Sequence, residues 1–230
     1  MIKNEVFVYK KEDVLGEAGK FFVKACGFDL EKQKHQKMLS EATELLDREK
    51  RSFEMKAICS ELAKEVFHNN MLEVAGNTIS CNYFGHIDEK KVTRILIAMV
   101  TAGDWELESA SKSRFRVYMD TWGTAFADSA KTLFEEAIKK RLGAGEYLSN
   151  PFGPGYYGIP SSDIKKLVSV IDTGKIGVSL NSAGLMIPLK SIAAIYFVTS
   201  KQSIMPPVAC SECFGKIGGC RNCSNYISAM

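Results

Sequence analysis

Residues 94–101, with the sequence RILIAMVT, form a nearly continuous apolar run. A strand that packs on one face alternates apolar and polar side chains, whereas an unbroken run of this length is typical of a strand covered on both faces. Gly103 follows the run and is expected to end the strand. The rest of the chain therefore has to cover both faces of a sheet.

The other segments supply both kinds of secondary structure. Runs rich in β-branched and aromatic residues predict further strands at residues 5–9, 78–84, 176–180 and 191–199. Apolar residues at helical spacing predict helices at residues 13–20, 34–48, 55–67, 117–141 and 164–171. Asn69 and Asn70 would end the third of these helices. Because helices and strands interleave irregularly, we expect an α+β domain with helices packed on a largely antiparallel sheet.

The longest predicted helix, residues 117–141, has a clear apolar face. Its predicted buried side chains are Trp122, Phe126, Ala130, Leu133, Phe134, Ala137 and Ile138. Gly143 and Gly145 follow and would stop the helix. Asp120 and Asp128 lie eight residues apart and therefore share a face, which we interpret as a pair of surface charges.

The composition excludes several classes of protein. Hydrophobic residues make up 46% and charged residues 25% of the 230 residues, as in an ordinary globular protein. The net charge is +3 and basic residues are mixed with acidic ones, which argues against a nucleic-acid or anionic-membrane partner. No apolar run approaches the ~18 residues that a membrane span needs, and the first residues contain no apolar signal segment. We therefore expect a cytoplasmic protein.

Residues 150–160, NPFGPGYYGIP, contain three prolines and three glycines. Such a segment cannot continue a helix and is poorly suited to a central strand. The prolines restrict the backbone, whereas the glycines let it approach a ligand closely. Tyr156 and Tyr157 offer flat amphipathic surfaces. The loop is either a preformed binding surface or a rigid Ω-loop whose tyrosines cover the core.

Four of the seven cysteines are bunched near the C-terminus in the pattern C-x2-C-x6-C-x2-C: Cys210, Cys213, Cys220 and Cys223. Each C-x-x-C turn can direct two thiolates at one ion, and two such turns can complete a tetrahedron. The pattern predicts a metal site in a small module, residues 206–230, that follows one domain formed by residues 1–205. Zinc and a [4Fe–4S] cluster both take four thiolates, and the spacing does not decide between them. Two disulfides or free thiols are the alternatives.

Three segments together carry a resemblance to a known family: residues 120–141 (DTWGTAFADSAKTLFEEAIKKR), the tripeptide PGY at residues 154–156, and residues 176–198 (IGVSLNSAGLMIPLKSIAAIYFV). The turn into the last strand adds Met186, Pro188, Lys190 and Ser191 as anchors. The chain resembles the activation, or S-adenosylmethionine-binding, domain of cobalamin-dependent methionine synthase, and in particular stand-alone relatives of that domain in anaerobic bacteria. The resemblance implies a C-shaped single α+β domain with a twisted antiparallel sheet.

The resemblance also implies a ligand and a partner. Domains of this family dock over the corrinoid of a partner and present S-adenosylmethionine to it, with the PGY loop beside the methyl donor. Carried over to this chain, Gly153 would contact the ligand through its backbone, and Tyr156 would face the corrinoid, with Pro154 and Gly155 between them.

Two departures from the family pattern bear on the ligand. Pro151 stands where the family has an arginine that holds the carboxylate of S-adenosylmethionine, and Thr132 aligns with a glutamate of the family helix. A charge-assisted hydrogen bond contributes about 1.5–3 kcal/mol, so the loss of both contacts predicts weak binding of S-adenosylmethionine. The chain shows no catalytic dyad, and no catalytic residue is predicted. Whether the chain is itself an enzyme is left open.

The sequence therefore predicts an accessory protein of a corrinoid-dependent methyltransferase system. It would dock on a corrinoid-carrying protein or corrinoid methyltransferase and assist its reactivation or handling. One alternative is a reductive activase, whose own iron–sulfur centre at the four cysteines reduces cobalt(II). Another is a module that binds a different small molecule in the same place.

Overall fold

The computed structural model describes residues 2–49, 53–81, 83–105 and 113–200. Its centre is a curled sheet of five antiparallel strands in the order β1-β2-β6-β10-β7. The strands are β1 (Glu5–Lys10), β2 (Glu54–Ala63), β6 (Val92–Thr101), β10 (Ser191–Thr199) and β7 (Tyr147–Leu148). The predicted class, an α+β domain with helices on an antiparallel sheet, is confirmed.

Both faces of the sheet are covered, as the apolar run of β6 predicts. Leu96, Ala98 and Val100 belong to one hydrophobic core. The alternating residues Ile97 and Met99 belong to a second core on the opposite face. Because side chains in a strand point alternately to the two faces, this near-continuous run serves both cores at once.

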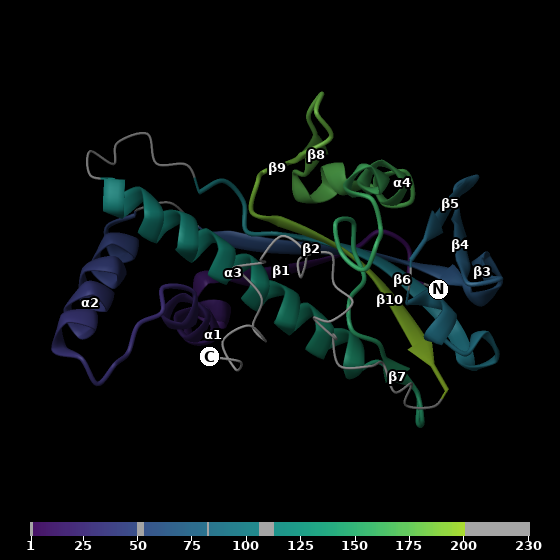
Figure 1. Ribbon diagram of the computed structural model, residues 1–230, viewed down its shortest axis with the longest axis horizontal. Coiled ribbons are helices and arrows are strands. Elements are labelled where there is room, and N and C mark those ends of the chain that lie inside the picture. The colour runs from purple at the N-terminus through teal and green to yellow at the C-terminus, as the bar shows by residue number, and fades with distance from the viewer. Residues whose placement is uncertain (1, 50–52, 82, 106–112, 201–230) are drawn as a thin grey trace.

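Three helices cover the first face: α1 (Lys11–Ala25), α2 (Gln33–Arg48) and α3 (Ser113–Lys139). Figure 1 shows α3 running diagonally across the sheet, with α1 and α2 beside its N-terminal half. The ring of Trp122 stacks on Phe22 with centroids 4.1 Å apart, and its Nε1 donates to the carbonyl oxygen of Ala42 at 3.1 Å. One buried indole thus joins α3 to both of the other helices.

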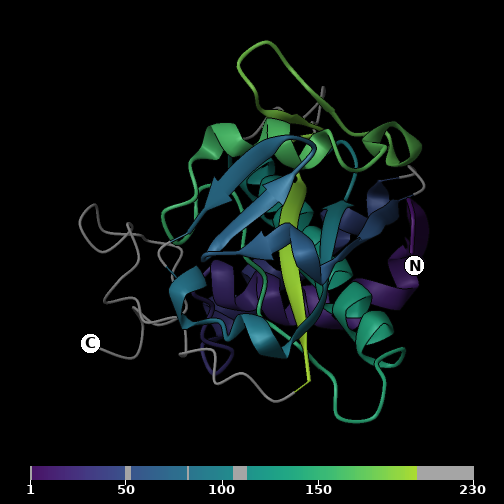
Figure 2. The ribbon, with the colours of Figure 1, turned by 90° about the vertical axis from the view of Figure 1, so that its right-hand side faces the viewer.

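The second face is covered by shorter elements. They are η1 (Lys64–Val66), β3 (Phe67–His68), β4 (Met71–Val74), β5 (Asn77–Ser80), η2 (Phe84–His86), η3 (Glu89–Lys91), η4 (Ser161–Asp163), α4 (Ile164–Val168), η5 (Thr173–Ile176), β8 (Ser179–Leu180) and β9 (Met186–Ile187). Figure 2 shows the small sheet β3-β4-β5 lying over β10. Phe84, Phe152 and Phe197 meet edge-on beneath it, with centroids 5.4 to 5.6 Å apart.

The prediction of a helix at residues 55–67 is wrong. The segment forms β2, the single turn η1 and the start of β3. Met55, Ala57 and Cys59 belong to the first core, whereas Ile58 between them belongs to the second. Burial on both faces removes the simple alternation of a strand, and residues with good helix propensity then mimic a helical pattern.

Asn69 and Asn70 do not end a helix but form the two-residue turn between β3 and β4. Their φ angles are +52° and +58°, and His68 pairs with Met71 across the turn. Two central residues with positive φ are the mark of a type I′ hairpin turn, for which asparagine is well suited. The sequence prediction missed β4 altogether.

The remaining predicted elements differ mainly in their ends. β10 has the predicted bounds, whereas α1 and α3 begin two and four residues earlier than predicted. The predicted strand at residues 78–84 is limited to Asn77–Ser80, and the one at residues 176–180 to Ser179–Leu180. The four C-terminal cysteines lie outside the described residues, so the division at residue 206 stays a prediction. Within the described ranges, no helix combines the length and apolar character needed to cross a bilayer.

Candidate ligand-binding cleft

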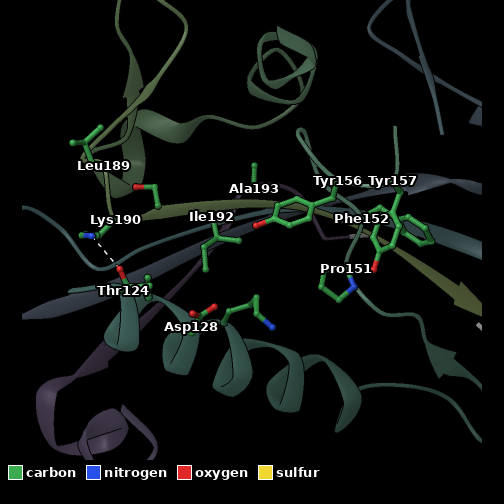
Figure 3. Close-up of a pocket in the computed structure, with 14 residues that line it drawn as sticks. Thr124, Asp128, Pro151, Phe152, Tyr156, Tyr157, Leu189, Lys190, Ile192 and Ala193 are labelled. Carbon is green, nitrogen blue, oxygen red and sulfur yellow. Dashed lines mark hydrogen bonds between the residues drawn. The ribbon is translucent and has the colours of Figure 1, made fainter. Parts of the chain in front are cut away.

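A cleft of about 470 Å³ lies between α3, the start of β10 and residues 150–160, which we term the PGY loop. Figure 3 shows the two tyrosines of the loop on one side and Leu189 and Lys190 on the other, above α3. The lining residues are Thr124, Ala127, Asp128, Lys131, Pro151, Phe152, Gly153, Tyr156, Tyr157, Leu189, Lys190, Ser191, Ile192 and Ala193. The volume falls in the range of small-molecule sites.

The PGY loop is tied to the edge of the main sheet. β7 pairs with the end of β10, and the backbone of Ser149 then donates to the carbonyl oxygen of Phe197 at 2.9 Å. Phe152 and Ile195 exchange two backbone hydrogen bonds of 2.9 and 2.7 Å. The Phe152 side chain is buried in the second core. The base of the loop is therefore held by the sheet itself.

Hydrogen bonds within the PGY loop define its turn. The backbone N–H of Tyr156 donates to the Gly153 carbonyl at 3.0 Å, and that of Gly155 donates to Ile159 at 2.8 Å. Gly155 has a φ of +88°, in the region where glycine carries no steric penalty. These backbone hydrogen bonds give the loop a defined shape.

Gly153 is required by the sheet, whatever its role toward a ligand. A Cβ atom at this position would lie 2.6 Å from the carbonyl oxygen of Ala193 in β10. The close backbone approach of loop and strand forms one wall of the cleft, since Gly153 and Ala193 both line it.

The two adjacent tyrosines lie in different environments. Tyr157 packs against Tyr83 and Phe152 with centroid distances of 5.0 and 5.4 Å, so it covers the second core. Tyr156 is 64% exposed and lines the cleft. The Ω-loop interpretation therefore describes Tyr157, whereas the role of Tyr156 toward a ligand stays a prediction.

Opposite charges lie at the base of the cleft, on α3. Asp128 is half-buried, and burial raises the pKa of its carboxyl group, an effect that the nearby Lys131 partly offsets. The ammonium group of Lys131 contacts Glu135 at 3.1 Å. The same Glu135 oxygen accepts a hydrogen bond of 2.9 Å from the buried hydroxyl of Tyr196. Glu135, which is itself hydrogen-bonded to Tyr196 of β10, thus holds the Lys131 side chain in the cleft.

Lys190 closes the other end of the cleft. Its ammonium group lies 2.6 Å from a carboxylate oxygen of Asp120 and donates to Thr124 Oγ1 at 3.0 Å, the dashed line in Figure 3. The neighbouring Ser191 hydroxyl donates to the Pro188 carbonyl at 2.7 Å. Two of the sequence anchors, Lys190 and Ser191, therefore fix the turn between β9 and β10, and Lys190 attaches this turn to α3.

Of the four loop residues expected to face the ligand or corrinoid, Gly153 and Tyr156 line the cleft, whereas Pro154 and Gly155 are not among its lining residues. The helix side of the cleft was not predicted. Thr124, Asp128 and Lys131 follow one another at spacings of four and three residues, so they share one face of α3. Asp128 is therefore a cleft residue rather than a surface charge. Thr132, the aligned position of the family glutamate, does not line the cleft; its hydroxyl donates to the Asp128 carbonyl at 3.1 Å. The spacing of these three polar residues along α3 was the sequence signal that could have identified the helix side of the cleft.

The predicted metal ligands, Cys210, Cys213, Cys220 and Cys223, lie outside the described residues. In the part of the chain that the structure describes, no group of three or more His, Cys, Asp or Glu side chains is arranged to hold a metal ion. Cys26, Cys59 and Cys81 are free thiols there. Burial raises the pKa of the Cys59 thiol to about 12, so this thiol is an unreactive core group.

The curled sheet, the three helices on one face and the cleft at the start of β10 make up an α+β fold that has a solved counterpart. In particular, a solved structure of the MetH reactivation domain bound to AdoHcy is similar to this chain with a TM-score of 0.67. The similarity covers 90% of this chain and 82% of that one, at 13% sequence identity. No protein-family model matches the chain, and a search of curated proteins gives no match either. The resemblance inferred from the sequence is thus confirmed at the level of the fold.

Proposed function

We propose that this chain is an accessory protein of a corrinoid-dependent methyltransferase system. It docks on a corrinoid-carrying protein through the face that contains the cleft, and it assists reactivation of that protein. The observation that supports this proposal is the exposed Tyr156 at a preformed cleft, in a fold shared with a reactivation domain.

The geometry of the loop suits docking onto a rigid partner. The hydrogen-bonded turn and the pairing of Phe152 with β10 fix the loop in advance, so little conformational entropy is lost when a partner binds. The Tyr156 ring presents a flat apolar face with a polar hydroxyl at its edge, which suits contact with a macrocycle that bears amide groups.

Replacement of Tyr156 tests the proposal. We expect Tyr156→Ala to weaken capture of a purified corrinoid-carrying protein while the circular dichroism spectrum and melting temperature stay unchanged, because the side chain is largely exposed. Tyr147→Ala is the matched control, since Tyr147 is 42% exposed but lies in β7, outside the cleft lining. If Tyr156→Ala captures the partner as well as the unaltered chain does, the PGY loop is not part of the docking surface.

A second candidate function is the binding of a small nucleoside-like ligand in the cleft. Asp128 and Lys131 place a negative and a positive group one helical turn apart at its base. This pair is complementary to the ammonium and carboxylate of an amino-acid group, such as that of AdoHcy, the ligand bound to the similar MetH domain. Lys131 would then supply the positive charge for the ligand carboxylate, which the family takes from an arginine at the position of Pro151.

Calorimetry distinguishes this candidate from a cleft that has lost such ligands. If the cleft binds S-adenosylmethionine or AdoHcy at submillimolar concentration, Lys131→Met should weaken binding about tenfold or more, as for one lost charge-assisted contact. Lys139→Met, an exposed lysine at the end of the same helix, serves as the control. Absence of heat with both ligands would leave protein docking as the only role of the cleft.

We further propose that the four C-terminal cysteines hold one metal centre in a separate module, residues 206–230. Cys213→Ser should release the metal, whereas Cys26→Ser, a change at a free thiol, should not. A brown protein absorbing near 400 nm after anaerobic purification would favour the reductive-activase alternative. A colourless zinc-containing preparation would exclude it, and retention of stoichiometric metal by Cys213→Ser would contradict the four-thiolate site.

A further inference from the structure

The segment that leads from β9 into β10 alternates between exposed and partly buried residues. Leu185, Ile187 and Leu189 are exposed by 56%, 41% and 60%, whereas Met186 and Pro188 are partly buried. Leu185 and Ile187 are two residues apart at β9, so they point to the same side, and Leu189 follows them in the turn that leads into β10. We term these three exposed aliphatic residues the hairpin stripe. The solvent-facing positions of a hairpin are commonly polar, whereas all three are aliphatic here.

The hairpin that carries the stripe has a fixed shape. Leu180 pairs with Met186, and both pack on the second core. The Asn181 side chain accepts hydrogen bonds of 3.0 Å from the backbone N–H groups of Ala183 and Leu185, which closes the turn. Figure 1 shows β8 and β9 projecting from the body of the domain. The stripe is therefore displayed in advance and loses little entropy on contact.

The hairpin stripe is continuous with the cleft. Leu189 lines the cleft on the side opposite Tyr156, as Figure 3 shows. The segments that carry these residues, 147–162 and 176–189, contain no charged side chain. Exposed apolar patches of this kind mark interaction sites, and a charged partner surface would be desolvated without compensation against them. The chemistry of these two segments therefore favours apolar, uncharged partner surface against them.

We propose that the hairpin stripe is the second half of the surface that docks the corrinoid-carrying protein. This inference rests on the proposed function. The PGY loop contacts the partner on one side of the cleft and the stripe contacts it on the other. The partner accordingly presents apolar, uncharged surface to the PGY loop and to the stripe, and the contacts that these two segments make depend little on salt.

The test is the affinity of the full chain for a purified corrinoid-carrying protein at low and high salt. We expect the double variant Leu185→Ser/Ile187→Ser to bind at least about tenfold more weakly, with an unchanged melting temperature because both residues are exposed. Val8→Ser is the matched control: Val8 is 53% exposed in β1, at the opposite edge of the sheet from β7. We expect this control to bind as the unaltered chain does.

Each other outcome has a defined meaning. If the double variant binds with unchanged affinity while Tyr156→Ala binds more weakly, the stripe does not belong to the docking surface. The proposed function would still hold. A failure of the unaltered chain to bind would instead contradict the proposed function. If the unaltered chain forms a dimer in sedimentation experiments and only the double variant is monomeric, the stripe contacts a second copy of this chain. That result would contradict the proposal.

Discussion

At the residue scale, the structure explains how one loop both packs and displays an aromatic side chain. Tyr157 has a φ of +53°, a conformation that is uncommon for residues other than glycine and that persists only where neighbouring contacts hold it. Its contacts with Tyr83 and Phe152 in the second core provide that hold. The preceding residue, Tyr156, is thereby left exposed at the cleft.

Gly153 offers a prediction about packing at this scale. Gly153→Ala should destabilise the fold by about 1–3 kcal/mol, because its Cβ would meet the Ala193 carbonyl oxygen at 2.6 Å and overpack the contact. Gly16→Ala, in α1 with no atom within 4 Å of the new Cβ, should instead stabilise by about 0.5–1 kcal/mol through helix propensity. Urea unfolding of both variants gives these values. Equal effects would contradict the close approach.

Glu146 offers a prediction about pH. The Arg94 guanidinium contacts it at 2.9 Å, and Gly143 N–H donates to it at 2.8 Å. The hydrogen bond from Arg94 is the largest cause that lowers its pKa, from 4.5 to about 2. A lowered carboxyl pKa stabilises the fold above the unfolded-state value of about 4.5, and that stability is lost as the pH falls toward 2.

Glu146→Gln tests this assignment. The variant should be less stable than the unaltered chain by about 1–3 kcal/mol at pH 7, because the ion pair with Arg94 is lost while both side chains stay three-quarters or more buried. The difference in unfolding free energy should shrink between pH 5 and pH 2. A difference that is constant over this range would show that the ionised carboxylate contributes nothing specific.

At the element scale, the sequence predicts elements well where a single pattern dominates. The bounds of β10 follow from its β-branched content, and the presence of the long amphipathic α3, though not its ends, follows from helical periodicity. β2 was missed because it serves two cores, so its helix-forming residues show no alternation. The small β3-β4-β5 sheet depends on two short turns, and turn chemistry of this kind is weak evidence in an isolated sequence.

The turn between β4 and β5 gives a prediction at this scale. Val74 pairs with Asn77, so Ala75 and Gly76 form a two-residue turn with φ angles of +46° and +74°. Asparagine followed by glycine is preferred in type I′ turns, whereas alanine with positive φ is strained. Ala75→Asn should therefore raise the unfolding free energy by about 0.5–1 kcal/mol, measured by urea denaturation. A destabilised variant would contradict the turn geometry.

The cleft was only half predictable for a related reason. The loop side is contiguous in sequence, and its prolines, glycines and tyrosines left two interpretations, a binding surface or a rigid loop that covers the core. The helix side needs Asp128 and Lys131 to lie opposite Tyr156, which depends on how α3 crosses the sheet. Such a long-range placement is a property of the packing of two cores and not of any local pattern.

At the scale of the whole molecule, the position of the cleft follows from the sheet order. Among the described residues, β10 pairs with β6 along one side, and on the other side it pairs only with β7 and Phe152 at its C-terminal half. Ser191, Ile192 and Ala193 are left to line the cleft. The site thus occupies the place where the neighbouring strand ends, and the PGY loop and the hairpin stripe lie on its two sides.

Hydrogen exchange of the full chain, with and without a purified corrinoid-carrying protein, tests the central claim most directly. We predict slower exchange on binding in two segments, residues 150–160 and 179–193, because both lie on the docking face. Residues 5–10 of β1 should exchange as in the free chain. Protection confined to other surfaces, or none at a concentration that saturates binding, would contradict the assignment of the cleft as the docking site.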